Sequence, residues 1–183
     1  KVKGRSITIS PESKWIKSSL LNIYIDRNVQ DYQKNRIDSP IDLYYSFTDY
    51  MPNSTISGSI IDIDNTIDKL NSMNSALVDY EVGLYKIYEM DTLLIKTVNS
   101  DENLGFNFSV LEPGRYSVVA VEDKISDIRE DLYKKKYSIL NHDIILIEND
   151  NQVATLNISD PIPNNSIVSI VFNNPYFVNY ILS

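Results

Sequence analysis

Apolar and polar residues alternate with period two along most of this chain, and this alternation predicts β-strands. The alternating segments are separated by short polar stretches rich in Asn, Asp, Ser and Pro, which favour turns. A dense series of short strands is typical of a β-sandwich. The predicted strands are 7–9, 21–25, 41–47, 55–63, 81–90, 93–98, 106–110, 116–122, 144–148, 152–158, 166–172 and 176–182.

The segment FNFSVLEPGRYSVVAVEDK contains a Pro-Gly pair between two alternating runs. Pro113 presets φ for the second position of a tight turn, and Gly114 is suited to the positive φ that a type II turn requires next. The sequence therefore predicts that residues 106–110 and 116–122 form a hairpin, with Pro113 and Gly114 as its structural turn.

Two segments lack strand periodicity. Residues 64–75 are rich in Asn and Ser and are expected to form a long loop. In residues 125–137, Ile125, Ile128 and Leu132 have helical spacing. For this second segment a helix of one or two turns and an irregular loop both remain open.

The chain has 183 residues and a formal net charge of −8. This charge argues against binding to nucleic acid or to anionic lipid, because both require a local excess of Lys and Arg. The one basic cluster, 134–136, follows the acidic run 127–131, and the pair is interpreted as a solvated face or loop. No apolar run in the sequence approaches the length of a membrane span.

Common catalytic arrangements are not supported by the residue inventory. The chain has no Cys and a single His, His142, which lies in a predicted turn. A nucleophilic triad or a tetrahedral zinc site is therefore not expected. The five Gly residues are scattered, so no phosphate-binding loop is present. We expect a protein that is not an enzyme and that has no cofactor.

Carboxylates are the remaining candidates for chemistry. Asp62 and Asp64 project from the same face of a predicted strand, and Asp123 and Asp127 lie in a predicted acidic loop. These four residues are candidate metal ligands, with calcium as the ion, although the loop lacks the EF-hand pattern. The alternative for the first pair is a plain half-exposed strand. A remote third function is a glycosidase that uses Asp62 and Asp64 as its carboxylate pair.

The first 50 residues contain SSLLNIYIDRNVQDYQKNRIDSPIDLYYSFTD, which resembles the C-terminal half of a bacterial Ig-like domain of the surface-layer type. The family pattern is a Tyr-containing strand, an Asp, a turn, a Pro and a final strand that ends in an aromatic residue and Thr. The matching residues are Tyr24, Asp31, Asn35, Pro40, Phe47 and Thr48. The usual turn Gly is replaced by QKNR.

The following segment, from ISGSIIDI to FNFSVLEPGRYSVVAVEDK, resembles the carboxypeptidase regulatory-like, or transthyretin-like, accessory domain. The residues that match its hairpin are Phe106, Phe108, Leu111, Pro113, Gly114 and Tyr116. The two resemblances imply an all-β fold in which a partial Ig-like sandwich is followed by a transthyretin-like, prealbumin-like sandwich. The expected units are 1–50, 51–160 and, as further strands that could begin another β unit, 161–183.

This combination resembles envelope lipoproteins of unknown function in Bacteroidota-type bacteria. It implies a noncatalytic scaffold or accessory subunit at the outer membrane, in the periplasm or at the cell surface, bound to protein partners and attached to membrane only through a lipid anchor or a partner. The chain starts at Lys1, which favours a mature or partial product. Partner contacts are expected on residues 7–47, where half of a sandwich would be exposed.

The alternative function is a glycan-binding or protein-binding module. The chain has 13 Tyr residues, and Tyr24 and Tyr44 fall on strand positions opposite the apolar face. Exposed tyrosine rings can stack on sugars while their hydroxyls form hydrogen bonds. The competing interpretation is that these tyrosines reflect the high β-propensity of aromatic residues.

Overall fold

The computed structural model of the chain describes residues 2–3, 6–8, 10, 20–64, 78–89 and 91–162. Most of these residues lie in strands, which confirms the all-β prediction. The predicted strands 166–172 and 176–182 lie outside the described residues, as do nearly all of the expected unit 161–183 and the predicted loop 64–75.

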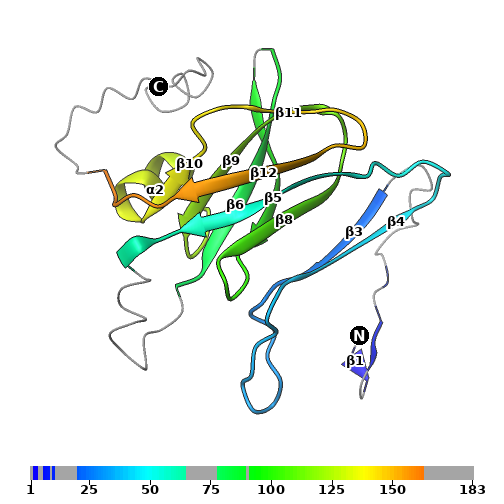
Figure 1. Cartoon of the computed structure of the whole chain (residues 1–183). Coiled ribbons are helices and arrows are strands. Elements are labelled where there is room, and N and C mark those ends of the chain that lie inside the picture. The colour runs from blue at the N-terminus through cyan, green and yellow to red at the C-terminus, as the bar shows by residue number, and fades with distance from the viewer. Residues whose placement is uncertain are drawn as a thin grey trace.

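Two sheets form the main body of the molecule (Figure 1). The larger sheet is antiparallel and has five strands: β10 (Tyr137–Ile139), β9 (Gly114–Glu122), β6 (Tyr80–Ile87), β7 (Thr92–Asn99) and, also paired with β9, β11 (Ile144–Leu146). The smaller sheet has three strands in the order β12 (Asn151–Asn157), β5 (Ser54–Ile61) and β8 (Gly105–Leu111). In the smaller sheet β12 runs parallel to β5, and β8 runs antiparallel to it.

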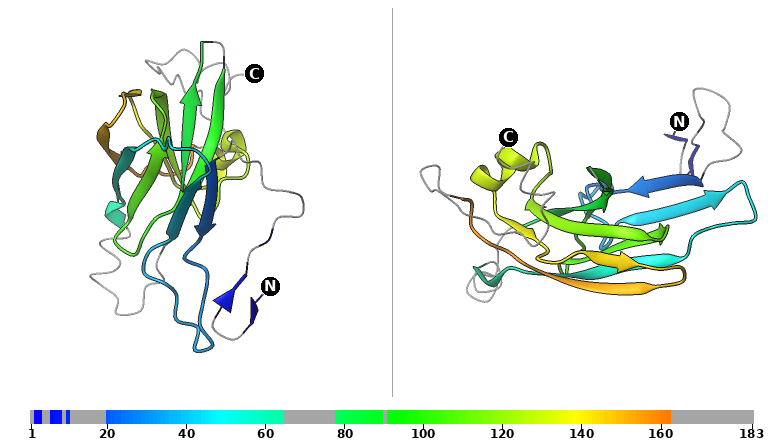
Figure 2. Two further views of the ribbon diagram at one scale, coloured as in Figure 1. Left: turned by 90° about the vertical axis from the view of Figure 1, so that its right-hand side faces the viewer. Right: turned by 90° about the horizontal axis from the view of Figure 1, so that it is seen from above.

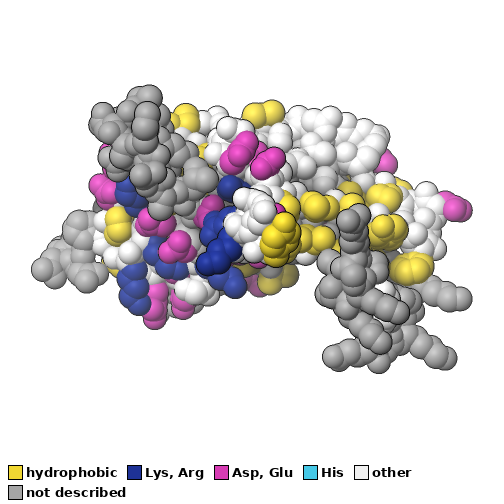
Figure 3. Space-filling model, turned by 90° about the horizontal axis from the view of Figure 1, so that it is seen from below, with side chains coloured by type: hydrophobic (Ala, Val, Ile, Leu, Met, Phe, Trp, Pro, Cys, Tyr) yellow, Lys and Arg dark blue, Asp and Glu magenta, His cyan; other side chains and the backbone are white. Residues whose placement is uncertain are grey.

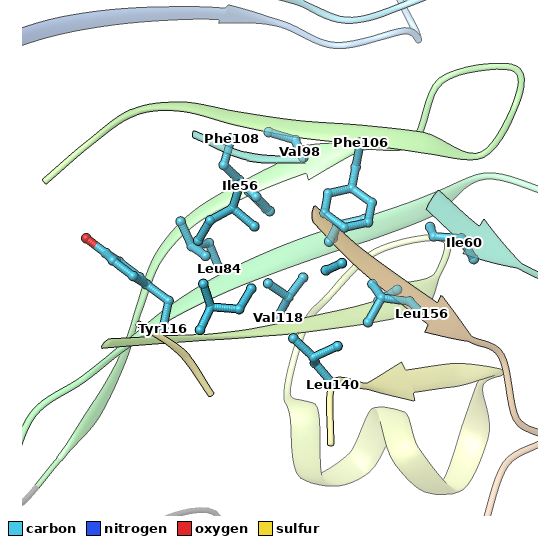
Figure 4. Close-up of a cluster of buried hydrophobic side chains, with 14 of the residues drawn as sticks. Ile56, Ile60, Leu84, Val98, Phe106, Phe108, Tyr116, Val118, Leu140 and Leu156 are labelled. Carbon is cyan, nitrogen blue, oxygen red and sulfur yellow. The ribbon is translucent and has the colours of Figure 1, made fainter. Parts of the chain in front are cut away.

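The apolar faces of the two sheets meet in one hydrophobic core (Figure 4). Ile56 from β5 and Phe108 from β8 pack in the same cluster as Leu84 from β6 and Val118 from β9, and all four side chains are fully buried. Because successive side chains on a strand point to opposite faces, the alternation in the sequence places these residues on the inner faces of the layers.

Residues 105–122 do not form the predicted hairpin. β8 pairs with β5 in the smaller sheet, whereas β9 pairs with β6 in the larger sheet. Pro113 lies in a bend, and Gly114 begins β9 without a left-handed φ. The type II turn prediction for Pro113 and Gly114 is therefore wrong, because alternation identifies two strands but does not say that they pair with each other.

The backbone of β8 is irregular just before the chain passes from the smaller sheet to the larger sheet. The register between β5 and β8 shifts between Ser54 and Ile56, so that β8 carries one extra residue. Val110, inside this bulge, has a φ of 59°. A β-branched residue rarely adopts the left-handed region, so Val110 is a strained position.

Helix α2 (Ile128–Lys134) lies within the segment for which a helix was one of two open interpretations, and settles that alternative in favour of the helix. Its Leu132 is fully buried. Ile125 and Ile128 pack on the outward face of the larger sheet, against a cluster made of Tyr85, Val119 and Val121. Among the described residues, no helix is long and apolar enough to cross a membrane.

The N-terminal part contributes two small antiparallel pairs beside this body (Figure 2). β1 (Val2–Lys3) pairs with β2 (Ser6–Ile7), and β3 (Leu20–Ile25) pairs with β4 (Ile41–Ser46). The β3–β4 hairpin is connected through residues 47–53 to β5, and its polar side chains contact the edge of the body at β7.

Candidate functional site

The structure brings the predicted metal ligands Asp62 and Asp64 to a lysine. Asp62 follows β5 and is 3% exposed, and the hydroxyl of Tyr80 donates a hydrogen bond of 2.6 Å to its Oδ2. Lys136 Nζ lies 3.8 Å from Asp62 Oδ1 and 3.1 Å from Asp64 Oδ2. The hydrogen bond to Asp64, followed by the attraction of Asp62, raises the pKa of Lys136. An ammonium group thus occupies the position that the sequence suggested for a cation.

Asp123 and Asp127 lie in the loop between β9 and α2. The backbone N–H of Asp123, a residue with φ of 63°, donates to the carbonyl of Asp79 over 2.8 Å, and the carbonyl of Asp127 accepts from the N–H of Asp131. Within the part of the chain that the structure describes, no three His, Cys, Asp or Glu side chains are grouped so that they could hold a metal ion. The calcium site stays a prediction.

The basic cluster 134–136 is matched residue by residue with carboxylates. Lys134 pairs with Glu130 within α2, Lys135, directly after the helix, pairs with Asp131, and Lys136 pairs with Asp64. The predicted turn residue His142 is exposed, and its Nδ1 lies 2.8 Å from Asn141 Oδ1. Only the Lys134–Glu130 pair is well solvated, since Asp131 is 1% exposed and the Lys135 and Lys136 side chains are about one quarter exposed.

Tyr24 and Tyr44 do not project into solvent as the glycan-binding alternative required. Both lie on the face of the β3–β4 hairpin that contacts the body. The Tyr24 hydroxyl accepts a 2.6 Å hydrogen bond from the backbone N–H of Asn99 at the end of β7, and burial raises its pKa to about 12. The Tyr44 hydroxyl donates to Asp42 Oδ2 over 2.8 Å, and its pKa is raised, first by burial and then by that bond.

Lys96 of β7 is the centre of this contact, which we call the polar joint: Asn22, Tyr24, Asp42, Tyr44, Lys96 and Asn99. The Lys96 ammonium lies 2.5 Å from Asp42 Oδ2, contacts the Tyr44 hydroxyl, and sits 4.6 Å from the centre of the Tyr44 ring. The side chains of Lys96 and Asp42 are only 15% and 16% exposed. Lys96 is the only charged residue in β7, and this signal in TLLIKTVN could have identified it from the sequence.

A second ionic contact fixes the loop that follows β3. Arg27 is 5% exposed, and its Nη1 lies 3.3 Å from Asp79 Oδ1 and 3.2 Å from the carbonyl of Ser100. Arg36 Nη1 reaches the other carboxylate oxygen of Asp79 at 2.8 Å. The loop between β3 and β4 is therefore attached to the body by charged groups.

The opposite face of the β3–β4 hairpin is apolar and points away from the body. Register places Leu21 opposite Tyr45, Ile23 opposite Leu43, and Ile25 opposite Ile41. We call these six residues the outer face. Ile41, Leu43 and Tyr45 are 42%, 41% and 54% exposed, and the other three are partly exposed. Seen from below, hydrophobic side chains form a band on the side where the hairpin lies, while charged side chains gather on the other side (Figure 3).

The hairpin is thus inverted relative to an ordinary sandwich layer, in which the apolar face turns inward. On β4 the polar residues Asp42, Tyr44 and Ser46 are half-buried and the apolar residues Ile41, Leu43 and Tyr45 are exposed. On β3 the apolar residues of the outer face are half-buried, and Leu20 and Asn22 on the other face are exposed. Since no charged residue belongs to the outer face, this surface is suited to binding another apolar surface.

No protein-family model, curated protein or solved structure matches this chain.

Proposed function

We propose that this chain is a noncatalytic accessory or scaffold subunit of a cell-envelope or surface assembly, and that it docks to a protein partner through the outer face. The proposal rests on the inversion of the β3–β4 hairpin, which leaves Ile41, Leu43 and Tyr45 exposed. Contiguous apolar patches on soluble proteins are usually interaction sites. The location agrees with the expectation that partner contacts concentrate on residues 7–47.

The occupant is the apolar face of a β-sheet in a different protein. The outer face is formed by two paired strands with alternating side chains, and such a surface packs well on a second sheet about 10 Å away. A second copy of this chain is disfavoured because each copy carries a formal charge of −8. The partner therefore has an uncharged contact surface with a neutral or basic periphery.

A noncatalytic role is supported by the way the candidate carboxylates are used. Asp62 is buried against Tyr80 and Lys136, and Asp64 shares the same lysine. Placement at the cell envelope rests on the resemblance to Ig-like and transthyretin-like accessory domains, together with the two-layered β architecture. On this proposal, contact with the membrane is made by a lipid anchor or by the partner.

Site-specific photo-cross-linking in cells of the native source tests the docking. Replacement of Tyr45 by p-benzoylphenylalanine puts the reactive group on the outer face, and the same replacement of Tyr133, which is 42% exposed on α2, is the matched control. The expected result is a single adduct from Tyr45, joined to a partner peptide with alternating apolar residues, that disappears when Ile41→Thr and Leu43→Thr are added. Threonine keeps the β-propensity while removing apolar surface.

Three results would overturn the docking proposal. They are the absence of an adduct from Tyr45, an equal yield of the same adduct from Tyr133, and an adduct that joins Tyr45 to a second copy of this chain. Circular dichroism of the Thr variants shows that loss of the adduct is not loss of the fold.

A further inference from the structure

A groove opens where the end of the β3–β4 hairpin meets the body. It has a volume of about 420 Å³ and is lined from both parts of the chain, including Ser46, Thr48 and Tyr50 on one side and Lys86, Tyr88 and Glu112 on the other. Ligand sites commonly have this size and lie between structural units. The groove lies beside the inner face of the hairpin, because Ser46 shares that face with Tyr44, and so it is separate from the outer face.

The polar centre of the groove is a lysine beside a carboxylate. Lys86 Nζ lies 3.4 Å from Glu112 Oε2, and their side chains are 20% and 67% exposed. An ammonium has three donor hydrogens, and a carboxylate has several acceptor positions, so one long contact between them leaves both donors and acceptors for a ligand. Their charges cancel. The pair is therefore complementary to a neutral group that both donates and accepts, such as two adjacent hydroxyls.

Two tyrosine rings lie near the ammonium of this pair. Lys86 Nζ lies 5.9 Å from the centre of the Tyr88 ring and 5.8 Å from that of Tyr116. Tyr116 is a core residue whose hydroxyl donates to the carbonyl of Glu112 over 2.7 Å, whereas Tyr88 and Tyr50 are 47% and 55% exposed. The two exposed rings offer apolar surfaces next to polar groups, and the buried ring fixes the backbone that carries Glu112.

The groove wall also contains a strained backbone position. Val110 lines the groove, and it has a φ of 59° within the bulge of β8. Bulges re-aim side chains, and left-handed β-branched residues persist where the surrounding structure enforces them, often at binding sites. Glu112 follows two residues later, so the bulge determines where this carboxylate stands relative to Lys86.

We propose that this groove binds a neutral saccharide. The apolar C–H face of a sugar ring stacks on Tyr88, the exposed ring beside Lys86, while two adjacent hydroxyls bind the Lys86 ammonium and the Glu112 carboxylate. We place the candidate glycan-binding site in this groove and not at Tyr24 and Tyr44, because those two tyrosines are held in the polar joint. It goes beyond partner docking, and because it leaves the outer face free, both surfaces can be occupied together.

Isothermal titration of the full chain with six neutral oligosaccharides tests this proposal: cellohexaose, laminarihexaose, maltohexaose, xylohexaose, mannohexaose and chitohexaose. We expect at least one to bind with a Kd between about 1 μM and 1 mM, a range that corresponds to about 8 to 4 kcal/mol. Lys86→Met and Tyr88→Ala should each weaken that binding by about tenfold or more. The matched controls Lys134→Met and Tyr133→Ala, on the exposed side of α2, should leave it unchanged.

The proposal is overturned if none of the six binds, if binding survives both Lys86→Met and Tyr88→Ala, or if the α2 controls weaken it equally. Binding of polygalacturonate in place of the neutral oligosaccharides would also overturn it, because the Lys86–Glu112 pair would then act as an anion site. None of these results bears on cross-linking from the outer face, so the two proposals fail independently.

Discussion

At the scale of single residues, Gly58 lies where two strands approach too closely for any side chain. A Cβ at this position would lie 1.9 Å from the carbonyl oxygen of Ala154, which is backbone of the parallel neighbour β12. The sheet must separate locally to accept a methyl group. We expect Gly58→Ala to lower the free energy of unfolding by about 1–3 kcal/mol, measured by urea denaturation.

Gly114 provides the matched comparison. Its added Cβ would lie 3.2 Å from Lys86 Cε and 3.3 Å from Tyr116 Cε2, which are side-chain atoms, and its φ is not left-handed. The loss of glycine freedom in the unfolded chain favours alanine by about 0.4–1 kcal/mol and offsets the crowding. Gly114→Ala should therefore change the unfolding free energy by less than about 1 kcal/mol. A loss as large as that of Gly58→Ala would restore the turn role predicted from the sequence.

Tyr24 makes the stability of the polar joint sensitive to alkaline pH. Burial raises its pKa from 10.0 to about 12, so the unfolded chain loses the phenolic proton at lower pH than the folded chain. The stability that the protonated Tyr24 contributes is therefore fully present below pH 10 and is lost as the pH rises toward 12. Urea denaturation across this range should show a smaller loss of stability for Tyr24→Phe than for the wild type. Equal pH dependence of the two proteins would contradict the assignment.

At the scale of elements, alternation predicts the strands well but not their partners. The segments that became β5, β6, β7, β8, β9 and β12 each have long period-two patterns, and all six are strands. The three-residue strand β10 is too short for such a pattern to register. The parallel pairing of β12 with β5 and the separation of β8 from β9 depend on which apolar faces pack together, and this is a property of the whole chain.

At the candidate site, too, the sequence identifies residues without identifying their partners in space. The sequence places Asp62 and Asp64 on one strand face, but Lys136, which lies between them in space, is 72 residues away from Asp64 in the chain. Apolar alternation in β3 and β4 likewise predicts an apolar face without saying that it points to solvent. That orientation is set by Asp42 and Lys96, which meet across 54 residues of sequence.

The Lys96–Asp42 ion pair should hold the hairpin against the body. Because both side chains are about 15% exposed, each single variant, Lys96→Met or Asp42→Asn, leaves a poorly solvated partner behind. In a double-mutant cycle we expect a coupling energy of about 1–3 kcal/mol, together with loss of amide protection in β3 and β4. The exposed pair Lys134–Glu130 is the control, and its coupling should be far smaller. A negligible coupling for Lys96 and Asp42 would mean that the polar joint does not position the hairpin.

At the scale of the whole molecule, the chain combines a closed core with an open apolar surface. The body buries its apolar side chains between two sheets, as in an ordinary sandwich, whereas the β3–β4 hairpin exposes Ile41, Leu43 and Tyr45 of β4. A two-stranded sheet is only marginally stable by itself, and here its attachment through polar groups leaves the apolar side available. The body and the exposed apolar residues of β4 are therefore separate surfaces, and the groove that we propose for a saccharide lies between the hairpin and the body.

Cysteine-scanning of β4 tests whether this strand of the hairpin turns its apolar residues outward. The chain has no cysteine, so Leu43→Cys, Tyr44→Cys, Tyr45→Cys and Ser46→Cys each introduce a single thiol. Labelling with a maleimide under native conditions should alternate, with residues 43 and 45 fast and residues 44 and 46 slow. Labelling in the opposite phase, or without alternation, would contradict the inverted hairpin and the docking surface that depends on it.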